Sequence, residues 1–103
     1  KLDEIEKRKK LTQDVFALAK SSSLIALGDL VRYHKDIGVP TKQWWSESYK
    51  LYFAALKAMP TNGHAHNQLG LLSTLAKNSL AAAHHYARAL LSRRPFEAAK
   101  DNL

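Results

Sequence analysis

The chain has 103 residues, 46% of them apolar, and a formal net charge of +7 at pH 7. This length allows one domain, or part of one, with a core but a high ratio of surface to volume. The sequence contains no cysteine, which excludes disulfides and cysteine-based metal sites and fits a reducing compartment. We expect a cytoplasmic protein, with shuttling to the nucleus as a further option. No apolar run approaches the roughly 20 residues of a membrane span, so we expect no membrane partner.

The first predicted helix covers residues 1 to about 20, with apolar residues at helical spacing. Its expected buried positions are Leu2, Ile5, Val15, Phe16 and Ala19. The basic run 7–10 is expected to be a solvated face, with nucleic-acid binding or nuclear import as the alternative. The serines at 21–23 predict a break in the chain, and they can cap a second helix from about 24 to 35.

The segment 36–42 contains the helix breakers Gly38 and Pro40, and Thr41 is the expected cap of a third helix over about 42–58. This helix carries a series of aromatic residues, which we expect to serve core and inter-helix packing rather than the stacking of bases. The series consists of Trp44, Trp45, Tyr49, Tyr52 and Phe53.

The C-terminal half predicts two more helices joined by short turns. The sequence 60–63 is a strong turn signal, and a fourth helix follows over about 64–75. A turn at 77–78 leads to a fifth helix over about 79–92, and a final helix begins at Pro95 or Phe96. No strand pattern competes with these helices.

Two stretches of the chain repeat one pattern, in which a Leu-Gly pair is followed by a small, aromatic, small series and then a proline. The matched residues are Gly28, Ser48, Tyr52 and Ala55 in the first copy and Gly70, Ala82, Tyr86 and Ala89 in the second. The two glycines are 42 residues apart, which equals a tetratricopeptide (TPR) unit of about 34 residues plus an insertion of about eight between the helices of the first copy.

The repeat predicts an all-α fold of TPR-like antiparallel hairpins. Residues 24–60 form the first hairpin, with the insertion, and residues 63–95 the second, within a single helical domain or fragment over 1–103. Chance similarity between two hairpins rich in alanine and leucine is the alternative. Because stacked repeats normally number about three, we expect another element to cover the open faces.

The distribution of charge favours an anionic partner. Between Ile37 and Phe96 the only acidic residue is Glu47, against seven lysines and arginines. A solvated basic surface without a specific ligand is the alternative.

The sequence gives no sign of catalysis or of a metal site. His64 and His66 alternate and His84 and His85 are adjacent, whereas ligands on one helical face lie three or four residues apart. There is no glycine-rich phosphate loop and no nucleophile elbow. We therefore expect a binding module, not an enzyme, without metal or cofactor.

The strongest candidate site lies after Gly28. On a helix, Asp29, Arg32 and Tyr33 share one face, and a guanidinium beside a phenol hydroxyl can bind a phosphate. Asn67 falls on another position that lines the groove in TPR folds, and its amide can hold a peptide backbone. The alternative, equal on spacing alone, is that Arg32 only pairs with Asp29 and Tyr33 lies in the core.

Several blocks together resemble the 14-3-3-like TPR domain of the SMG/EST family, which comprises nonsense-mediated mRNA decay adaptors and telomerase-associated proteins. The resemblance covers roughly residues 24–103, and its blocks are Leu27-Gly28-Asp29-Leu30-Val31-Arg32-Tyr33, then Pro60 to Gly70 with Asn67-Gln68-Leu69, then His85-Tyr86-Ala87-Arg88-Ala89-Leu90, and Pro95-Phe96 through Asn102-Leu103.

The resemblance implies a module that binds phosphoserine or phosphothreonine segments, notably those of the phosphorylated decay helicase. It places Arg32 in the phosphate pocket with Tyr33 beside it, Asp29 as the orienting residue, and Asn67 on the peptide backbone. Arg88 matches the tyrosine-arginine block of the fifth helix and joins the expected phosphopeptide site. The resemblance also implies a basic pocket residue from an upstream helix, and some family members act mainly through dimerisation with a related domain.

Two other functions remain open from the sequence. The net charge allows binding of RNA or telomeric nucleic acid, with determinants over 7–10, Lys42, Arg93 and Arg94. The chain can also be a dimerisation scaffold without a phosphate pocket, in which the family blocks serve packing alone.

Overall fold

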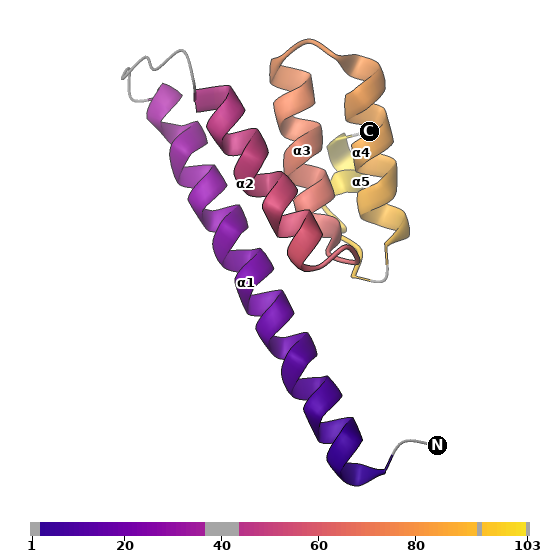
Figure 1. Ribbon diagram of the computed structural model, residues 1–103. Coiled ribbons are helices and arrows are strands. Elements are labelled where there is room, and N and C mark those ends of the chain that lie inside the picture. Colours follow the sequence, from indigo (N-terminus) through magenta and orange to yellow (C-terminus); the bar gives the residue numbers. More distant parts are fainter. Residues whose placement is uncertain (1–2, 37–43, 93, 103) are drawn as a thin grey trace.

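The computed structural model describes residues 3–36, 44–92 and 94–102, and most of these residues are helical (Figure 1). The helices are α1 (Glu4–Asp36), α2 (Trp44–Ala58), α3 (Gly63–Leu75), α4 (Ser79–Leu91) and α5 (Ala99–Asn102). Within the described residues no β-strand occurs, and an isolated bridge joins Asn62 to Arg94. The predicted all-α fold class is confirmed. None of the helices in this described part is long and apolar enough to cross a membrane.

The helices pack as two hairpins, α1 with α2 and α3 with α4, and α2 lies beside α3 (Figure 1). Both hairpins close on a glycine. A Cβ atom on Gly28 would lie 2.4 Å from Cε1 of Tyr52, and one on Gly70 would lie 2.5 Å from Cε1 of Tyr86. Each tyrosine ring therefore rests directly on the backbone of the partner helix, which explains the spacing of the repeat.

The predicted break at residues 21–23 is wrong, because α1 is one helix of 33 residues that runs through the serines. Ser21 is fully buried; its hydroxyl donates to the carbonyl of Ala55 at 2.8 Å and accepts from the amide of Asn62 at 3.0 Å. Serine costs a helix only about 0.5 kcal/mol relative to alanine. The contacts with α2 and with the turn before α3 favour the continuous helix.

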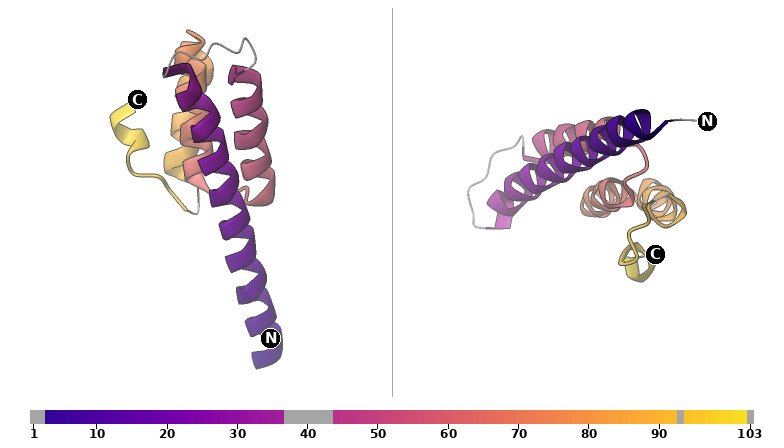
Figure 2. Two further views of the ribbon diagram at one scale, coloured as in Figure 1. Left: turned by 90° about the vertical axis from the view of Figure 1, so that its left-hand side faces the viewer. Right: turned by 90° about the horizontal axis from the view of Figure 1, so that it is seen from below.

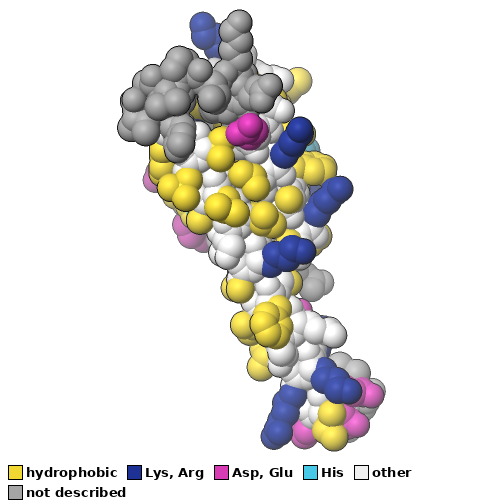
Figure 3. Space-filling view, turned by 60° about the vertical axis from the view of Figure 1, so that its left-hand side comes forward, with side chains coloured by type: hydrophobic (Ala, Val, Ile, Leu, Met, Phe, Trp, Pro, Cys, Tyr) yellow, Lys and Arg dark blue, Asp and Glu magenta, His cyan; other side chains and the backbone are white. Residues whose placement is uncertain are grey.

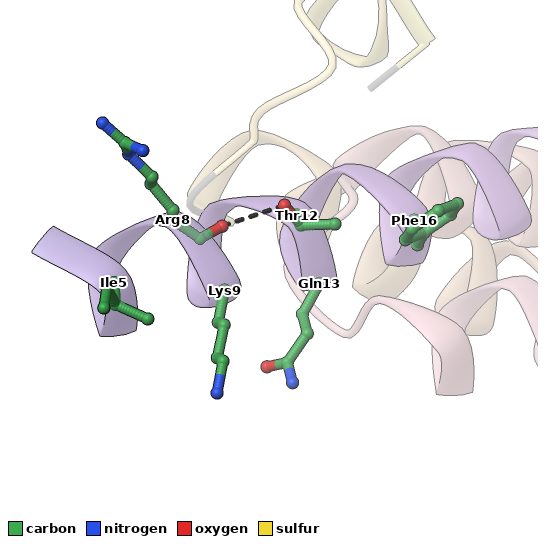
Figure 4. A pocket seen from close by; sticks show the side chains of 6 residues that line it. All are labelled: Ile5, Arg8, Lys9, Thr12, Gln13 and Phe16. Atoms are coloured by element: carbon green, nitrogen blue, oxygen red, sulfur yellow. Dashed lines mark hydrogen bonds between the residues drawn. The ribbon is translucent and has the colours of Figure 1, made fainter.

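The first half of α1 extends beyond the rest of the chain (Figure 1), so the burial predicted there is also wrong. Ile5, Val15 and Phe16 are 66%, 58% and 70% exposed, and Ala19 is exposed as well. Leu2 lies outside the described residues. Ile5 and Phe16 line a shallow surface hollow to which α1 alone contributes (Figure 4). A surface formed by one helix is not a binding cleft.

The aromatic series of α2 is divided between core and surface. Tyr52 is fully buried, as expected, but Trp45, Tyr49 and Phe53 are 37–41% exposed and stack on one another with ring centroids 5.4 and 5.9 Å apart. The side chain of Trp44 lies outside the described residues. Apolar side chains gather on the face of the molecule that is formed by α1 and α2. Lysine and arginine side chains lie along the border of this face (Figure 3).

In the second hairpin, the turn before α3 and the chain after α4 lie next to each other and are joined by hydrogen bonds. Asn62 caps α3, where its side-chain oxygen accepts from the backbone N–H of His64 at 3.2 Å. The backbone of Arg94 exchanges hydrogen bonds with Thr61 and Gly63. The chain then crosses one side of the α3–α4 pair to α5 (Figure 2), where Ala99 is buried.

Some predicted ends lie elsewhere or cannot be compared. The final helix, expected from Pro95 or Phe96, begins only at Ala99. The breakers Gly38 and Pro40 and the cap Thr41 lie outside the described residues.

Candidate functional site

The site forms around the carboxylate of Asp29, where three helices meet. Oδ1 of Asp29 on α1 accepts from the hydroxyl of Tyr52 on α2 at 2.5 Å and from the amide of Gln68 on α3 at 2.7 Å. Arg32 lies one turn further along α1, with a terminal nitrogen 3.6 Å from the same oxygen. Its Nε donates to the Tyr52 hydroxyl at 3.3 Å. The structure therefore brings Asp29 and Arg32 together, as their i, i+3 spacing predicts.

Backbone packing places the Tyr52 hydroxyl at this position. Because Gly28 has no side chain, the ring of Tyr52 approaches α1 closely. Ser48, one turn earlier on α2, donates to the carbonyl of Gly28 at 3.1 Å and fixes the same approach. The hydroxyl is thereby held between the carboxylate and the guanidinium.

Protonation within this cluster is well defined. Burial opposes the charge of Arg32, but the hydrogen bond with Tyr52 and the charge of Asp29 outweigh it, so the pKa of Arg32 is raised. Burial and the hydrogen bond to Asp29 raise the pKa of Tyr52, which stays neutral and remains a donor. The cluster is therefore an ion pair joined by a phenol.

Tyr33 lies outside the core and next to the guanidinium. Its side chain is 48% exposed, and Cζ of Arg32 lies 4.8 Å from the centroid of its ring. The interpretation of Tyr33 as a core residue is therefore wrong. It is the ring of Tyr33 that meets Arg32, in a cation–π contact. Of the terminal nitrogens of Arg32, one is near Asp29 and the other makes no hydrogen bond within the described residues.

Asn67 belongs to the same network but lies beneath the surface. It is 3% exposed, its Nδ2 donates to Gln68 at 2.9 Å, and its oxygen accepts from Asn102 at 3.1 Å. Contact between Asn67 and a peptide therefore requires the segment that carries Asn102 to move aside.

Arg88 lies in different surroundings. It is exposed on α4, and its charge is one cause of the lowered pKa of His66 on α3. Within the described part of the chain, no hydrogen bond or ion pair joins Arg88 to Arg32, Tyr33 or Asn67. The structure therefore connects Asp29, Arg32 and Asn67 through one network and Arg88 with the histidines.

The histidines pair between helices. Nδ1 of His66 and Nδ1 of His85 are 3.5 Å apart, although spacing along one helix gave no indication of this pair. His64 instead stacks on Phe96 at a centroid distance of 4.3 Å. Among the described residues, no group of three or more histidines and carboxylates is placed to hold a metal ion.

Sequence reasoning missed two members of the cluster. The aromatic series predicts a packing role alone for Tyr52, and the family resemblance implies no separate role for Gln68. The sequence signal for Tyr52 is its place in the repeat, which sets it opposite Gly28. Because Asp29 directly follows Gly28, the hydroxyl of Tyr52 is then expected near Asp29. The sequence carries no such signal for Gln68, because its burial and its place opposite α1 are set by the packing of the helices.

Comparison with known proteins identifies relatives of this arrangement. A family model described as the Est1 DNA/RNA binding domain matches residues 48–103. A nonsense-mediated mRNA decay factor SMG7-like protein of Arabidopsis thaliana is 38% identical over 80 residues, which cover 77% of this chain and 9% of that protein. The nonsense-mediated mRNA decay factor SMG5 of Danio rerio is 36% identical over 81 residues, which cover 78% of this chain and 7% of that protein.

A solved structure shows the same fold. A chain in the structure of the C. elegans SMG5-SMG7 complex matches with a TM-score of 0.73 and 26% identity, covering 84% of this chain and 20% of that one. This chain spans less than a tenth of the length of the two decay factors above. The family model covers more than half of the chain and includes Tyr52, Asn67, Gln68 and Arg88, while the relatives extend the match over more than three quarters. The chain belongs to the SMG/EST family, the family of the Est1 DNA/RNA binding domain.

Proposed function

We propose that this chain is a non-catalytic adaptor module of nonsense-mediated mRNA decay that binds phosphoserine or phosphothreonine peptides, with the phosphorylated decay helicase as the expected partner. The observation that carries the proposal is the guanidinium of Arg32, oriented by Asp29 and Tyr52 and stacked on the exposed ring of Tyr33. The names of the decay factors that the chain resembles support the pathway. We propose a cytoplasmic location for this activity.

The geometry suits a phosphate because the arginine is already held in place. Nε and one terminal nitrogen of Arg32 face Tyr52 and Asp29, which fixes the plane of the guanidinium before a ligand arrives. Binding then costs little side-chain entropy, and the remaining N–H donors form charge-assisted hydrogen bonds with the phosphate. The ring of Tyr33 lies against the guanidinium and adds a cation–π contact that helps to hold it in place.

The peptide backbone and a second domain complete the proposal. Asn67 holds the peptide once Asn102 releases its amide oxygen, and Arg88 binds an acidic residue away from the phosphate. The solved relative is a complex of two such proteins, SMG5 and SMG7. We propose that a related domain is a partner of this chain too.

The test is calorimetry with a phosphoserine peptide and its unphosphorylated twin. We expect preference for the phosphorylated peptide, and we expect Arg32→Glu to weaken that binding by more than about tenfold, because it removes a charge-assisted contact and adds repulsion. Circular dichroism checks that the variant keeps its helical content. Equal binding of both peptides, or unchanged binding by folded Arg32→Glu, contradicts the proposal.

Arg8→Glu is the matched control, since it makes the same change of charge on the protruding half of α1. Arg8 is exposed, and Figure 4 shows it on the surface of that helix. We expect phosphopeptide binding to be unchanged in this variant. Equal losses in Arg8→Glu and Arg32→Glu indicate a response to net charge alone.

Binding of RNA or DNA is the second candidate, favoured by the description of the family model and by one feature of the structure. Lys10 of α1 and Arg94, far apart in sequence, line one surface hollow together with Asp14, Met59 and Thr61. Lys42 and Arg93, the other expected determinants, lie outside the described residues. If the chain binds nucleic acid, its affinity should fall steeply as the salt concentration rises. An affinity that does not change with salt counts against this function.

A further inference from the structure

One pair of side chains has no role in the proposed function. His66 on α3 is 6% exposed and His85 on α4 is half-buried, and their Nδ1 atoms face each other at 3.5 Å. His84 is exposed beside them, with its ring centroid 5.3 Å from that of His85. A hydrogen bond between the two neutral imidazoles requires that one ring carry its proton on Nδ1, which donates, and the other on Nε2, so that its Nδ1 accepts.

The distance between the two Nδ1 atoms is close to the distance between two histidine nitrogens that bind the same metal ion. Histidine nitrogens bind Zn²⁺ at about 2.0–2.1 Å, so two of them at a tetrahedral angle lie about 3.4 Å apart. The observed separation of 3.5 Å is therefore compatible with one ion shared by both nitrogens, once the rings turn so that both lone pairs face it. The two side chains belong to neighbouring helices, α3 and α4, which pack against each other.

We propose that His66 and His85 form a two-histidine site for a divalent transition-metal ion that favours imidazole, such as Zn²⁺, Ni²⁺ or Cu²⁺, and that this ion links α3 to α4. Water completes the coordination, because no third ligand is placed among the described residues.

The surroundings set both the strength and the limits of this site. Burial, helped by the charges of His85, Arg88 and His84, lowers the pKa of His66 to about 4, and burial with the charge of His84 lowers that of His85. Both rings are therefore neutral at pH 7, and protons do not compete with the ion. Arg88 repels a cation, so Arg88→Gln is expected to tighten metal binding.

The test is calorimetric titration of the chain with ZnCl₂ and NiCl₂ at pH 7. We expect one ion per chain and a loss of affinity of more than about tenfold in His85→Ala, since half of the protein ligands are gone. His64→Ala is the matched control: it removes a histidine from α3, the helix that carries His66, but one that stacks on Phe96, and the metal affinity of this variant is expected to be unchanged. Absence of binding in the original chain, or equal loss in both variants, overturns the proposal.

A second measurement does not depend on how the variants fold. Long-range ¹H–¹⁵N spectra of the original chain report each imidazole nitrogen separately. Addition of Zn²⁺ is expected to shift Nδ1 of His66 and Nδ1 of His85 together, with little change at His64. A shift at the exposed His84 alone means adventitious surface binding and refutes the site.

Discussion

The two hairpins pack in the same way but differ in the polar side chains at equivalent positions. Gly28 and Gly70 accept a tyrosine ring at nearly the same distance, and Ser21 and Gly63 lie at equivalent places against the carbonyls of Ala55 and Ala89. The helix-to-helix contact is therefore one design used twice.

The tyrosine hydroxyls show the difference. In the first hairpin the hydroxyl of Tyr52 meets Asp29 and Arg32. In the second, the equivalent positions hold Leu71 and Thr74, and among the described residues the hydroxyl of Tyr86 forms a hydrogen bond with Thr74 alone, at 3.3 Å. The two hairpins therefore have the same helix packing. They differ because Asp29 and Arg32 replace Leu71 and Thr74, and the tyrosine hydroxyl of the first hairpin therefore binds charged side chains.

The second hairpin has its own polar feature. His66 and His85 stand where the first hairpin has Leu24 and Leu51. Two apolar positions of one hairpin are therefore ionisable in the other.

The largest expected effect comes from acidification, which tests this difference. The pKa of His66 falls from 6.5 to about 4 on folding. Between these values the unfolded chain binds more protons than the folded one, so stability is full above pH 6.5 and falls as pH falls. We expect a loss of about 2–3 kcal/mol by pH 4. Urea unfolding of the chain and of His66→Leu across this range measures it; similar pH slopes in both proteins contradict the assignment.

The next effect compares the hydroxyls. We expect Tyr52→Phe to cost about 1.5–3 kcal/mol, because the partly buried carboxylate of Asp29 loses a donor, and Tyr86→Phe to cost about 0.5–1.5 kcal/mol because it loses a bond between neutral groups. Chemical denaturation of both variants measures the difference. Tyr52→Phe should also weaken phosphopeptide binding, whereas Tyr86→Phe should not. Equal costs for the two variants indicate that the charged cluster adds nothing to the first hairpin.

The smallest effect tests what the hairpins share. Gly28→Ala and Gly70→Ala each force a methyl group into a tyrosine ring. Overpacking costs about 1–3 kcal/mol. Alanine returns about 1 kcal/mol through its helix propensity, so we expect a net loss of about 0–2 kcal/mol at each site. Thermal unfolding followed by circular dichroism gives both values, and a stabilised variant at one site shows that its ring moves freely.

Much of the fold was predictable because local signals agreed with the tertiary contacts. The turn before Gly63, the short turn after α3 and the small and aromatic positions of the repeat all predicted structure that is observed. The errors lie where a local signal opposed a distant contact. Serine is a capping residue, but Ser21 stays helical because α2 offers it a buried acceptor.

The candidate site was only partly predictable. Asp29 and Arg32 meet because they lie one turn apart on a single helix, and spacing is enough to show that. Tyr52 and Gln68 reach the same carboxylate from 23 and 39 residues away, which no local pattern reveals. The same holds for the pair formed by His66 and His85, which are 19 residues apart.

The sequence by itself therefore determined the helical class, the hairpin repeat and the family, because periodicity, turn residues and close-packed glycines are local properties. The tertiary structure alone decided which polar groups meet: the burial of Asn67, the exposure of Tyr33 and of the first half of α1, and the separation of Arg88 from the Arg32 network. The burial and the contacts of these residues depend on how helices that are far apart in the sequence pack together. Which groups form hydrogen bonds and which lose water is set by that packing.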